Sequence, residues 1–202
     1  MGMYYRVILS ICKVYAVVAY NLKYRGTENL LQDENYILCS NHKSFIDPIF
    51  VGIATKKELS FMAKEELFKK PILGSIIRKL GAFPVGRGKN DLNAIGMAKQ
   101  VVADGKVFSI FPEGTRSKTD NLLKFKSGAA LVASQTGAKI VPVCIWFTGK
   151  LRFRKKVIIR FGKPIENSEL GVIAGERSNI KEATRLLQSR VEALKQQSQA
   201  EY

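Results

Sequence analysis

Apolar and polar positions follow two main patterns along this chain. Short, mostly apolar runs, typical of strands buried on both faces, lie at residues 36–39, 59–63, 106–111, 140–147 and 157–161. Longer segments whose apolar residues recur every three or four positions, as in amphipathic helices, lie at 65–80, 90–103, 126–136 and 180–197. A proline at position 71 should break the first of these helices. Strands that alternate with helices predict an α/β fold with a mostly parallel central sheet flanked by helices.

The first 25 residues follow a third pattern. They are mostly apolar, with a narrow polar stripe at helical spacing that includes Arg6, Ser10 and Lys13. The longest unbroken apolar run, residues 14–20, is far shorter than the roughly 20 residues that a membrane-spanning helix needs. The tyrosines that accompany it are typical of a helix lying in the membrane interface. We therefore expect residues 1–25 to form an interfacial membrane-binding helix and residues 26–202 to form one α/β domain. A core helix with a small solvated edge and a single tilted span are the alternatives.

The charge balance narrows the class of partner. Lysine and arginine total 33 against 17 acidic residues, which gives a net charge of +16. Such an excess indicates an anionic partner: a nucleic acid, a membrane surface or a phosphorylated substrate. The basic residues accompany apolar segments, and no helix-turn-helix, RNP or zinc-finger pattern is present. A nucleic-acid-binding domain is therefore a remote alternative, and an anionic membrane surface is the expected partner.

The cysteines and the single histidine exclude further classes of protein. Cys12, Cys39 and Cys144 are odd in number, far apart and set in apolar runs, as buried reduced thiols of a cytosolic protein would be. One histidine and the absence of a Cys-x-x-Cys pair exclude a structural zinc site.

The single histidine, His42, follows the apolar run 36–39 and precedes Asp47-Pro48. That dipeptide predicts a helix start, with Asp47 at the N-cap and Pro48 as the first helical residue. His42 should then lie in a strand-to-helix loop, where α/β sheets hold their functional groups. From a loop the Asp47 carboxylate can fold back onto the imidazole, whereas on a regular helix the two groups would point about 140° apart. Taken alone, the pair is equally consistent with a simple helix cap.

Two more loops follow predicted strands. Arg87 ends a short predicted strand, and Glu113, Gly114 and Arg116 follow the apolar run at 106–111. Because the carboxyl ends of parallel strands lie on one edge of a sheet, the three loops can converge. A base, a carboxylate to orient it and two guanidinium groups suit a substrate with one hydroxyl to deprotonate and one phosphate to bind.

Four segments of the chain together resemble the motif blocks of the glycerolipid acyltransferases. They are Asn41-His42-x-x-x-x-Asp47, the stretch from Phe83 to Arg87, Phe111-Pro-Glu-Gly-Thr-Arg-Ser117, and Val141-Pro-Val143. The resemblance is closest to the bacterial 1-acyl-sn-glycerol-3-phosphate acyltransferases, the lysophosphatidic acid acyltransferases, and covers residues 26–165 in the family's order and spacing. The His-x4-Asp element alone occurs by chance, but its combination with the third block is specific. Pro84, inside the second block, departs from the family's pattern.

The resemblance implies a reaction. A fatty acyl group would pass from an acyl thioester, acyl-acyl-carrier protein or acyl-coenzyme A, to the sn-2 hydroxyl of lysophosphatidic acid, giving phosphatidic acid. His42 would be the general base on that hydroxyl, and Asp47 would orient His42 and stabilise the imidazolium that forms. A thioester is already activated, so the resemblance implies no metal and no other cofactor.

The remaining site residues would bind the acceptor. By the same resemblance, Arg87 and Arg116 would hold the glycerol phosphate. Glu113 and Gly114 would shape that pocket, with Glu113 touching the glycerol backbone. Lys126 would be a further phosphate ligand, and residues 26–202 would be the acyltransferase domain.

Other activities stay open at this point. Another lysolipid or glycerol 3-phosphate could replace lysophosphatidic acid as acceptor. A lipid hydrolase would need a nucleophile, but no Gly-x-Ser-x-Gly is present, and Ser44 is the one hydroxyl near the histidine. The apolar amino-terminal segment and the excess of cations together predict a peripheral protein on the cytoplasmic face of the cell membrane.

Overall fold

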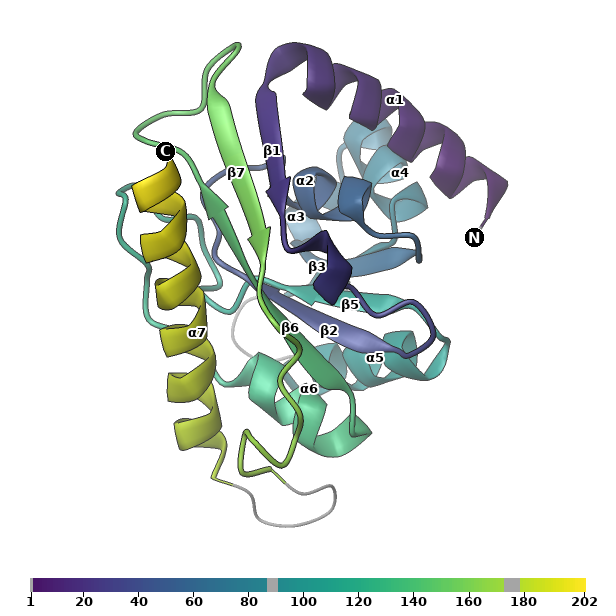
Figure 1. The fold of residues 1–202 in the computed structure, drawn as a ribbon. Helices are drawn as coiled ribbons and strands as arrows, with labels where there is room; N and C mark the ends of the chain where they lie inside the picture. The colour runs from purple at the N-terminus through teal and green to yellow at the C-terminus, as the bar shows by residue number, and fades with distance from the viewer. Residues whose placement is uncertain (1, 87–90, 173–178) are drawn as a thin grey trace.

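A central sheet forms the core of the computed structural model, which describes residues 2–86, 91–172 and 179–202 (Figure 1). Within these residues seven strands form one sheet, in the spatial order β1 (Asn21–Arg25), β7 (Lys156–Phe161), β6 (Lys139–Trp146), β2 (Tyr36–Ser40), β5 (Val107–Ile110), β3 (Leu59–Lys64) and β4 (Ala82–Val85). Neighbouring strands are parallel except β6 and β7, which are antiparallel. The predicted α/β fold with a mostly parallel sheet is therefore confirmed.

Helices cover both faces of this sheet. One face carries α1 (Met3–Ala19), α2 (Asp47–Ala54), α3 (Glu65–Phe68) and α4 (Pro71–Lys79). The other face carries α5 (Asp91–Ala103), α6 (Gly128–Thr136) and α7 (Ile180–Glu201). Figure 1 shows α7 along one side of the sheet and α1 close to α2 and α4. A single turn of 3-10 helix, η1 (Thr27–Asn29), follows β1.

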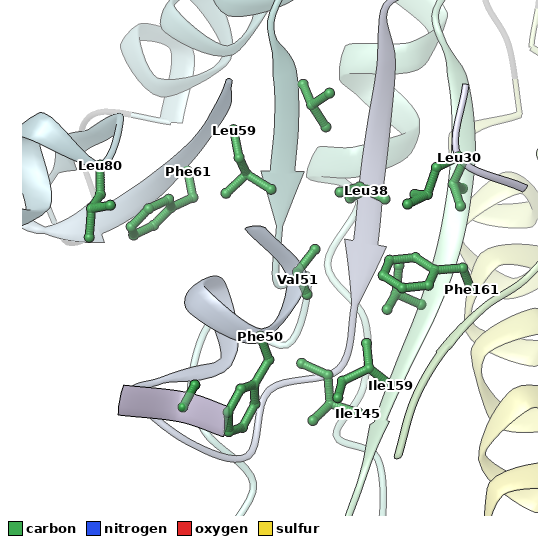
Figure 2. Close-up of a cluster of buried hydrophobic side chains, with 14 of the residues drawn as sticks. Leu30, Leu38, Phe50, Val51, Leu59, Phe61, Leu80, Ile145, Ile159 and Phe161 are labelled. Carbon is green, nitrogen blue, oxygen red and sulfur yellow. The ribbon is translucent and has the colours of Figure 1, made fainter. Parts of the chain in front are cut away.

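The mostly apolar runs are buried on both faces, as their pattern predicts. In β2, Tyr36 and Leu38 pack with the helices α1 to α4, whereas Ile37 and Cys39 pack with α5 to α7. Figure 2 shows Leu38 near Val51 of α2 in the first of these cores. Burial of each large aliphatic side chain contributes about 1.5–3 kcal/mol, so both layers are needed to hold the sheet.

The amino-terminal helix is shorter than expected, and this corrects the prediction that residues 1–25 form one helix. Helix α1 ends at Ala19, and residues 21–25 form the edge strand β1, paired with β7. Asn21-Leu22-Lys23-Tyr24-Arg25 alternates polar and apolar side chains, which is the signal of a half-buried strand. Tyr24 also donates its hydroxyl to the carbonyl of Phe50, 2.9 Å away. The division into a membrane-binding helix and a catalytic domain stays a prediction.

The helix expected at residues 65–80 is broken at Pro71, as predicted. Helix α3 ends at Phe68, and Pro71 lies in the first turn of α4, where its missing N–H has no partner to lose. Helix α7 extends beyond residue 197 to Glu201. Arg25 of β1 binds the Glu201 carboxylate at 2.6 Å, and Lys156 of β7 donates to the Glu201 carbonyl at 2.9 Å, so the edge strand and its neighbour hold the last turn of this helix.

The order of the strands creates a switch point beside β2. β2 and β5 are neighbours, yet the chain leaves β2 towards α2 on one face and leaves β5 towards α6 on the other. The loops that follow the two strands therefore diverge at the carboxyl edge of the sheet. Open α/β sheets bind their ligands at such points. Both His42 and the 111–117 motif lie in these loops.

Candidate active site

His42 and Asp47 form a hydrogen-bonded pair in the loop after β2. Nδ1 of His42 lies 2.8 Å from Oδ2 of Asp47, and the Asp47 side chain is fully buried while that of His42 is 19% exposed. A carboxylate only accepts, so the proton of the neutral ring is assigned to Nδ1. Nε2 has no hydrogen-bond partner in the described part of the chain, and in this tautomer it is the basic nitrogen.

The Asp47 carboxylate does not cap helix α2, and this corrects the expected helix start. The helix begins at Asp47 itself, after Ile46 as N-cap, with Pro48 in its first turn and no side-chain cap. Oδ2 instead accepts the backbone N–H groups of Lys43 and Ser44, each at 2.7 Å. The carboxylate therefore turns back into the loop and binds three donors, one of them the imidazole. Oδ1 is buried without a partner among the described residues.

The loop after β5 holds the backbone of His42 from both sides. Oε1 of Glu113 accepts the His42 N–H at 3.0 Å, and the Ser117 N–H donates to the His42 carbonyl at 2.8 Å. Oε2 of Glu113 accepts the Leu123 N–H at 3.1 Å. Burial raises the pKa of the Glu113 carboxyl group, and these N–H donors oppose that rise. Glu113 thus joins the two loops at the switch point, and its expected contact with the glycerol backbone stays a prediction.

Two further side chains position the histidine and were not among the expected site residues. The ring of Phe111 stacks on the imidazole, with centroids 4.3 Å apart and planes 29° apart. The Asn41 side-chain amide donates to the Ile145 carbonyl at 3.0 Å and accepts the Ile145 N–H at 2.8 Å. The motif blocks contain both residues, but spacing along the chain does not show that they support His42.

The expected phosphate ligands of the 111–126 region lie at the same edge. The guanidinium of Arg116 lies over the ring of Phe45, with its carbon 3.4 Å from the ring centroid, and both side chains are exposed. Gly114 has a φ of +68°, and a Cβ there would lie 2.9 Å from Nζ of Lys126. A glycine thus lets the Lys126 ammonium approach the backbone of the motif.

Two other cations occupy this edge of the sheet. Lys64 ends β3 and is exposed. Nζ of Lys43 is nearly buried, 2.7 Å from Oδ1 of Asp120 and 2.6 Å from the carbonyl oxygen of Phe147. Lys43 therefore fastens the histidine loop to the end of β6. Arg87 lies outside the described residues, just beyond the end of β4.

The fold and the site together are those of an α/β protein that holds an oriented histidine–aspartate pair beside exposed cations at the carboxyl edge of its sheet. Comparison with known proteins identifies the family of this chain. The sequence model of the family described as Acyltransferase matches residues 21–146, and the chain belongs to this family. A lysophosphatidic acid acyltransferase, PlsC from Thermotoga maritima, has a similar structure, with a TM-score of 0.73 and 25% identity over 96% of this chain and 79% of that one.

Curated relatives are also named as acyltransferases of an acylglycerol phosphate. The 1-acyl-sn-glycerol-3-phosphate acyltransferase of Streptococcus pneumoniae is 37% identical over 74% of this chain, which spans 58% of the length of that protein. The enzyme of the same name from Bacillus subtilis is 27% identical over 94% of this chain and 96% of its own length. The predicted family is therefore confirmed.

Two features are absent from the described residues, a metal-binding cluster and a membrane-spanning helix. No group of three or more histidine, cysteine, aspartate or glutamate side chains lies close enough to hold a metal ion. None of the helices found in this part of the chain is both long and apolar enough to cross a bilayer.

Proposed function

We propose that this protein transfers a fatty acyl group from an acyl thioester to the sn-2 hydroxyl of lysophosphatidic acid, which gives phosphatidic acid. The observation that carries the proposal is the His42–Asp47 pair at the switch point of the sheet, with a buried carboxylate on Nδ1 and an Nε2 that has no partner among the described residues. The relatives named as 1-acyl-sn-glycerol-3-phosphate acyltransferases support the choice of acceptor. Another lysolipid or glycerol 3-phosphate is the alternative acceptor.

The chemistry follows from this pair. Nε2 of His42 removes the proton of the acceptor hydroxyl as its oxygen attacks the thioester carbonyl, and the Asp47 charge stabilises the imidazolium. The tetrahedral intermediate then expels the thiolate, which takes the proton from the imidazolium and leaves as a thiol. A new ester bond replaces the thioester bond, and His42 returns to its neutral form. A positioned base of this kind contributes about 10²–10⁴-fold.

Cations at the same edge would bind the phosphate of the acceptor. Arg116 has no acidic partner among the described residues, and its stacking on Phe45 covers one face while its N–H edge stays available. Lys126 beside Gly114 is the second candidate, and Arg87 the third. Coenzyme A or an acyl-carrier protein would carry the donor acyl group.

Helix α1 would bring the site to the membrane. Tyr5, Ala16 and Ala19 pack inward, whereas eight large apolar side chains of this helix are 52–70% exposed: Met3, Tyr4, Val7, Ile11, Val14, Tyr15, Val17 and Val18. A face of this kind favours the interfacial interpretation over that of a core helix. The helix would then lie in the headgroup region of the cytoplasmic leaflet, as part of a peripheral membrane protein.

A transfer assay tests the proposal. Purified protein is mixed with labelled acyl-coenzyme A or acyl-acyl-carrier protein and each acceptor, and the lipid products are separated. His42→Ala should lose at least about 10²-fold in rate. His42→Gln is the matched variant, because its amide can still donate to Asp47 but cannot act as a base.

Three controls complete this test. Both variants should keep the wild-type unfolding transition and vesicle binding, so that a loss of rate reports on chemistry. A rate within tenfold of wild type in either variant would contradict the role of His42. Release of free fatty acid with no acceptor present would favour the hydrolase alternative.

A further inference from the structure

The loop between β6 and β7, residues 147–155, contains charged and aromatic side chains that have no role in the proposed reaction. Its sequence, Phe-Thr-Gly-Lys-Leu-Arg-Phe-Arg-Lys, contains four cations and no acidic residue. Phe153, between two arginines, is 73% exposed, more than most large apolar side chains of the protein. We call residues 147–155 the basic loop. An exposed aromatic side chain inside a cationic segment indicates that the binding partner has a surface that is both apolar and anionic.

Three of the four cations have no side-chain partner among the residues that the structure describes. Lys150, Arg152 and Arg154 are exposed, and in the described part of the chain their side chains make no ion pair or hydrogen bond. Lys155 donates to the Thr148 hydroxyl at 2.9 Å. The nearby carboxylate of Asp120 is bound by Lys43, which also lowers its pKa. The basic loop therefore presents three uncompensated positive charges.

The backbone of the basic loop is fixed to the end of helix α1. The Arg154 N–H donates to the Ala19 carbonyl at 2.6 Å, and the Asn21 N–H donates to the Lys155 carbonyl at 3.0 Å. Arg154 has a φ of +59°. Non-glycine residues seldom adopt this left-handed conformation, yet the chain has a charged side chain here. The side chains of the loop are thus presented from a held backbone.

The position of the basic loop matches that of the exposed face of α1. Figure 1 shows the loop and α1 at the same end of the sheet, flanking the start of β1. The exposed Val14, Tyr15, Val17 and Val18 belong to the last turns of α1, next to Ala19. The basic loop also begins at Phe147, whose carbonyl binds Lys43, the neighbour of the catalytic His42. One side of the molecule therefore carries the apolar helix, the loop and the site.

We propose that the basic loop is a second membrane contact, selective for anionic phospholipids, that acts together with α1. Phe153 inserts below the headgroups, and Lys150, Arg152 and Arg154 bind lipid phosphates. This inference rests on the membrane association of α1 in the proposed function. An acidic carrier protein would also attract the cations, but it does not account for the bare Phe153 beside the apolar face of α1.

The lipid contact predicts a charge-dependent affinity. Each cation near an anionic leaflet increases the partition coefficient about fivefold, so three cations give about 100-fold. The effect is confined to charged vesicles and weakens in high salt, because the ions screen exposed charges. Insertion of an aromatic side chain adds a contribution that salt does not remove.

Sedimentation of the full chain with vesicles tests this prediction. Vesicles of phosphatidylcholine alone are compared with vesicles that contain one quarter phosphatidylglycerol. The loop variant combines Lys150→Gln, Arg152→Gln and Arg154→Gly, where glycine removes the charge and relaxes the left-handed backbone. Its matched control combines Lys99→Gln, Lys181→Gln and Arg185→Gln, which changes the net charge equally on α5 and the start of α7. Both should unfold at the wild-type denaturant concentration.

The expected result is a loss of about 100-fold in binding to the anionic vesicles for the loop variant and little change for the control. Phosphatidylcholine binding should be similar for all three proteins. Phe153→Trp should show a blue-shifted emission on anionic vesicles and quenching by brominated acyl chains. Wild-type affinity in the loop variant, an equal loss in the control, or a Phe153→Trp signal without quenching would each overturn the proposal.

Two further measurements separate this inference from the proposed function. Val14→Glu with Val18→Glu should weaken binding to both kinds of vesicle, because these residues lie on the exposed face of α1. Transfer between short-chain, water-soluble substrates should be equal in the wild type and the loop variant. If transfer is intact but vesicle binding does not depend on the basic loop, only the lipid contact is overturned. If binding depends on the loop but no transfer occurs, the contact is supported and the proposed reaction is overturned. A raised KM for acyl-acyl-carrier protein alone, with vesicle binding intact, assigns the loop to a carrier instead.

Discussion

Asp47→Asn separates the charge of the site from its geometry. In the wild type, Oδ2 accepts from the imidazole and from two backbone N–H groups, while the buried Oδ1 has no partner among the described residues. Asparagine can place its carbonyl oxygen where Oδ2 lies and its NH2 group where Oδ1 lies. All three donors then keep an acceptor, and the proton stays on Nδ1 of His42. One unpartnered buried group simply replaces another.

The magnitudes follow from the same contacts. Unit charges about 4 Å apart interact by about 4 kcal/mol at an effective dielectric constant of 20, which corresponds to a factor of about 10³ in rate. Loss of the Asp47 charge should therefore lower kcat by about 10²–10³-fold, while the free energy of unfolding changes by less than about 1 kcal/mol. Asp47→Ala should also leave the backbone N–H groups of Lys43 and Ser44 without an acceptor, at a cost of about 1–3 kcal/mol each.

Denaturant unfolding and a transfer assay at saturating substrate measure the two quantities for both variants. The reasoning requires a large fall in kcat for both, but a large loss of stability only for Asp47→Ala. If Asp47→Asn lost stability like Asp47→Ala, the position of Oδ1 could not tolerate an NH2 group, and the assignment of the three donors to one oxygen would be wrong. If Asp47→Asn kept kcat within threefold of the wild type, charge stabilisation of the imidazolium would be refuted.

Two other predictions concern binding and burial. Arg116→Ala should raise the KM for the phosphate-bearing acceptor by about 10–100-fold, the range of a lost charged hydrogen bond, with less effect on kcat. Arg116→Lys should recover part of this loss. An unchanged KM in Arg116→Ala would exclude Arg116 as a phosphate ligand. Burial raises the pKa of Cys39 and of Cys144 to about 12, and also raises that of the less buried Cys12. A thiol reagent at pH 8 should therefore label native protein slowly and only at Cys12, whereas rapid labelling of a second thiol before unfolding would contradict the packing of β2 and β6.

The sequence predicts the sheet well because its central strands are buried on both faces, and mostly apolar runs satisfy that environment. The edge strand β1 was missed because its alternating pattern is five residues long and follows an apolar helix directly. The His42–Asp47 contact was predicted because both residues lie in one short loop. The support for it was not, since Glu113 is 71 residues from His42 in the chain, and a hydrogen bond to a backbone N–H leaves no trace in residue spacing.

The prediction that Asp47 caps helix α2 was wrong for a related reason. An aspartate near a helix start can accept from the helix or from the preceding loop, and residue type alone does not decide between them. Here the loop supplies three donors: the backbone N–H groups of Lys43 and Ser44 and the imidazole. The first turn of the helix contains Pro48, which has no N–H to donate. The tertiary position of His42 settles the choice.

The reversal of β7 determines which end of the molecule the amino terminus reaches. β1 is parallel to β7, and β7 is antiparallel to β6. Two strands that run against the rest of the sheet begin where the others finish. Had β7 followed a crossover and run with β6, a β1 parallel to it would start at the opposite edge, and α1 would lie far from His42. One antiparallel pairing thus places the apolar helix and the base on the same side of the molecule. A substrate held in a membrane leaflet could therefore reach the base without leaving the leaflet.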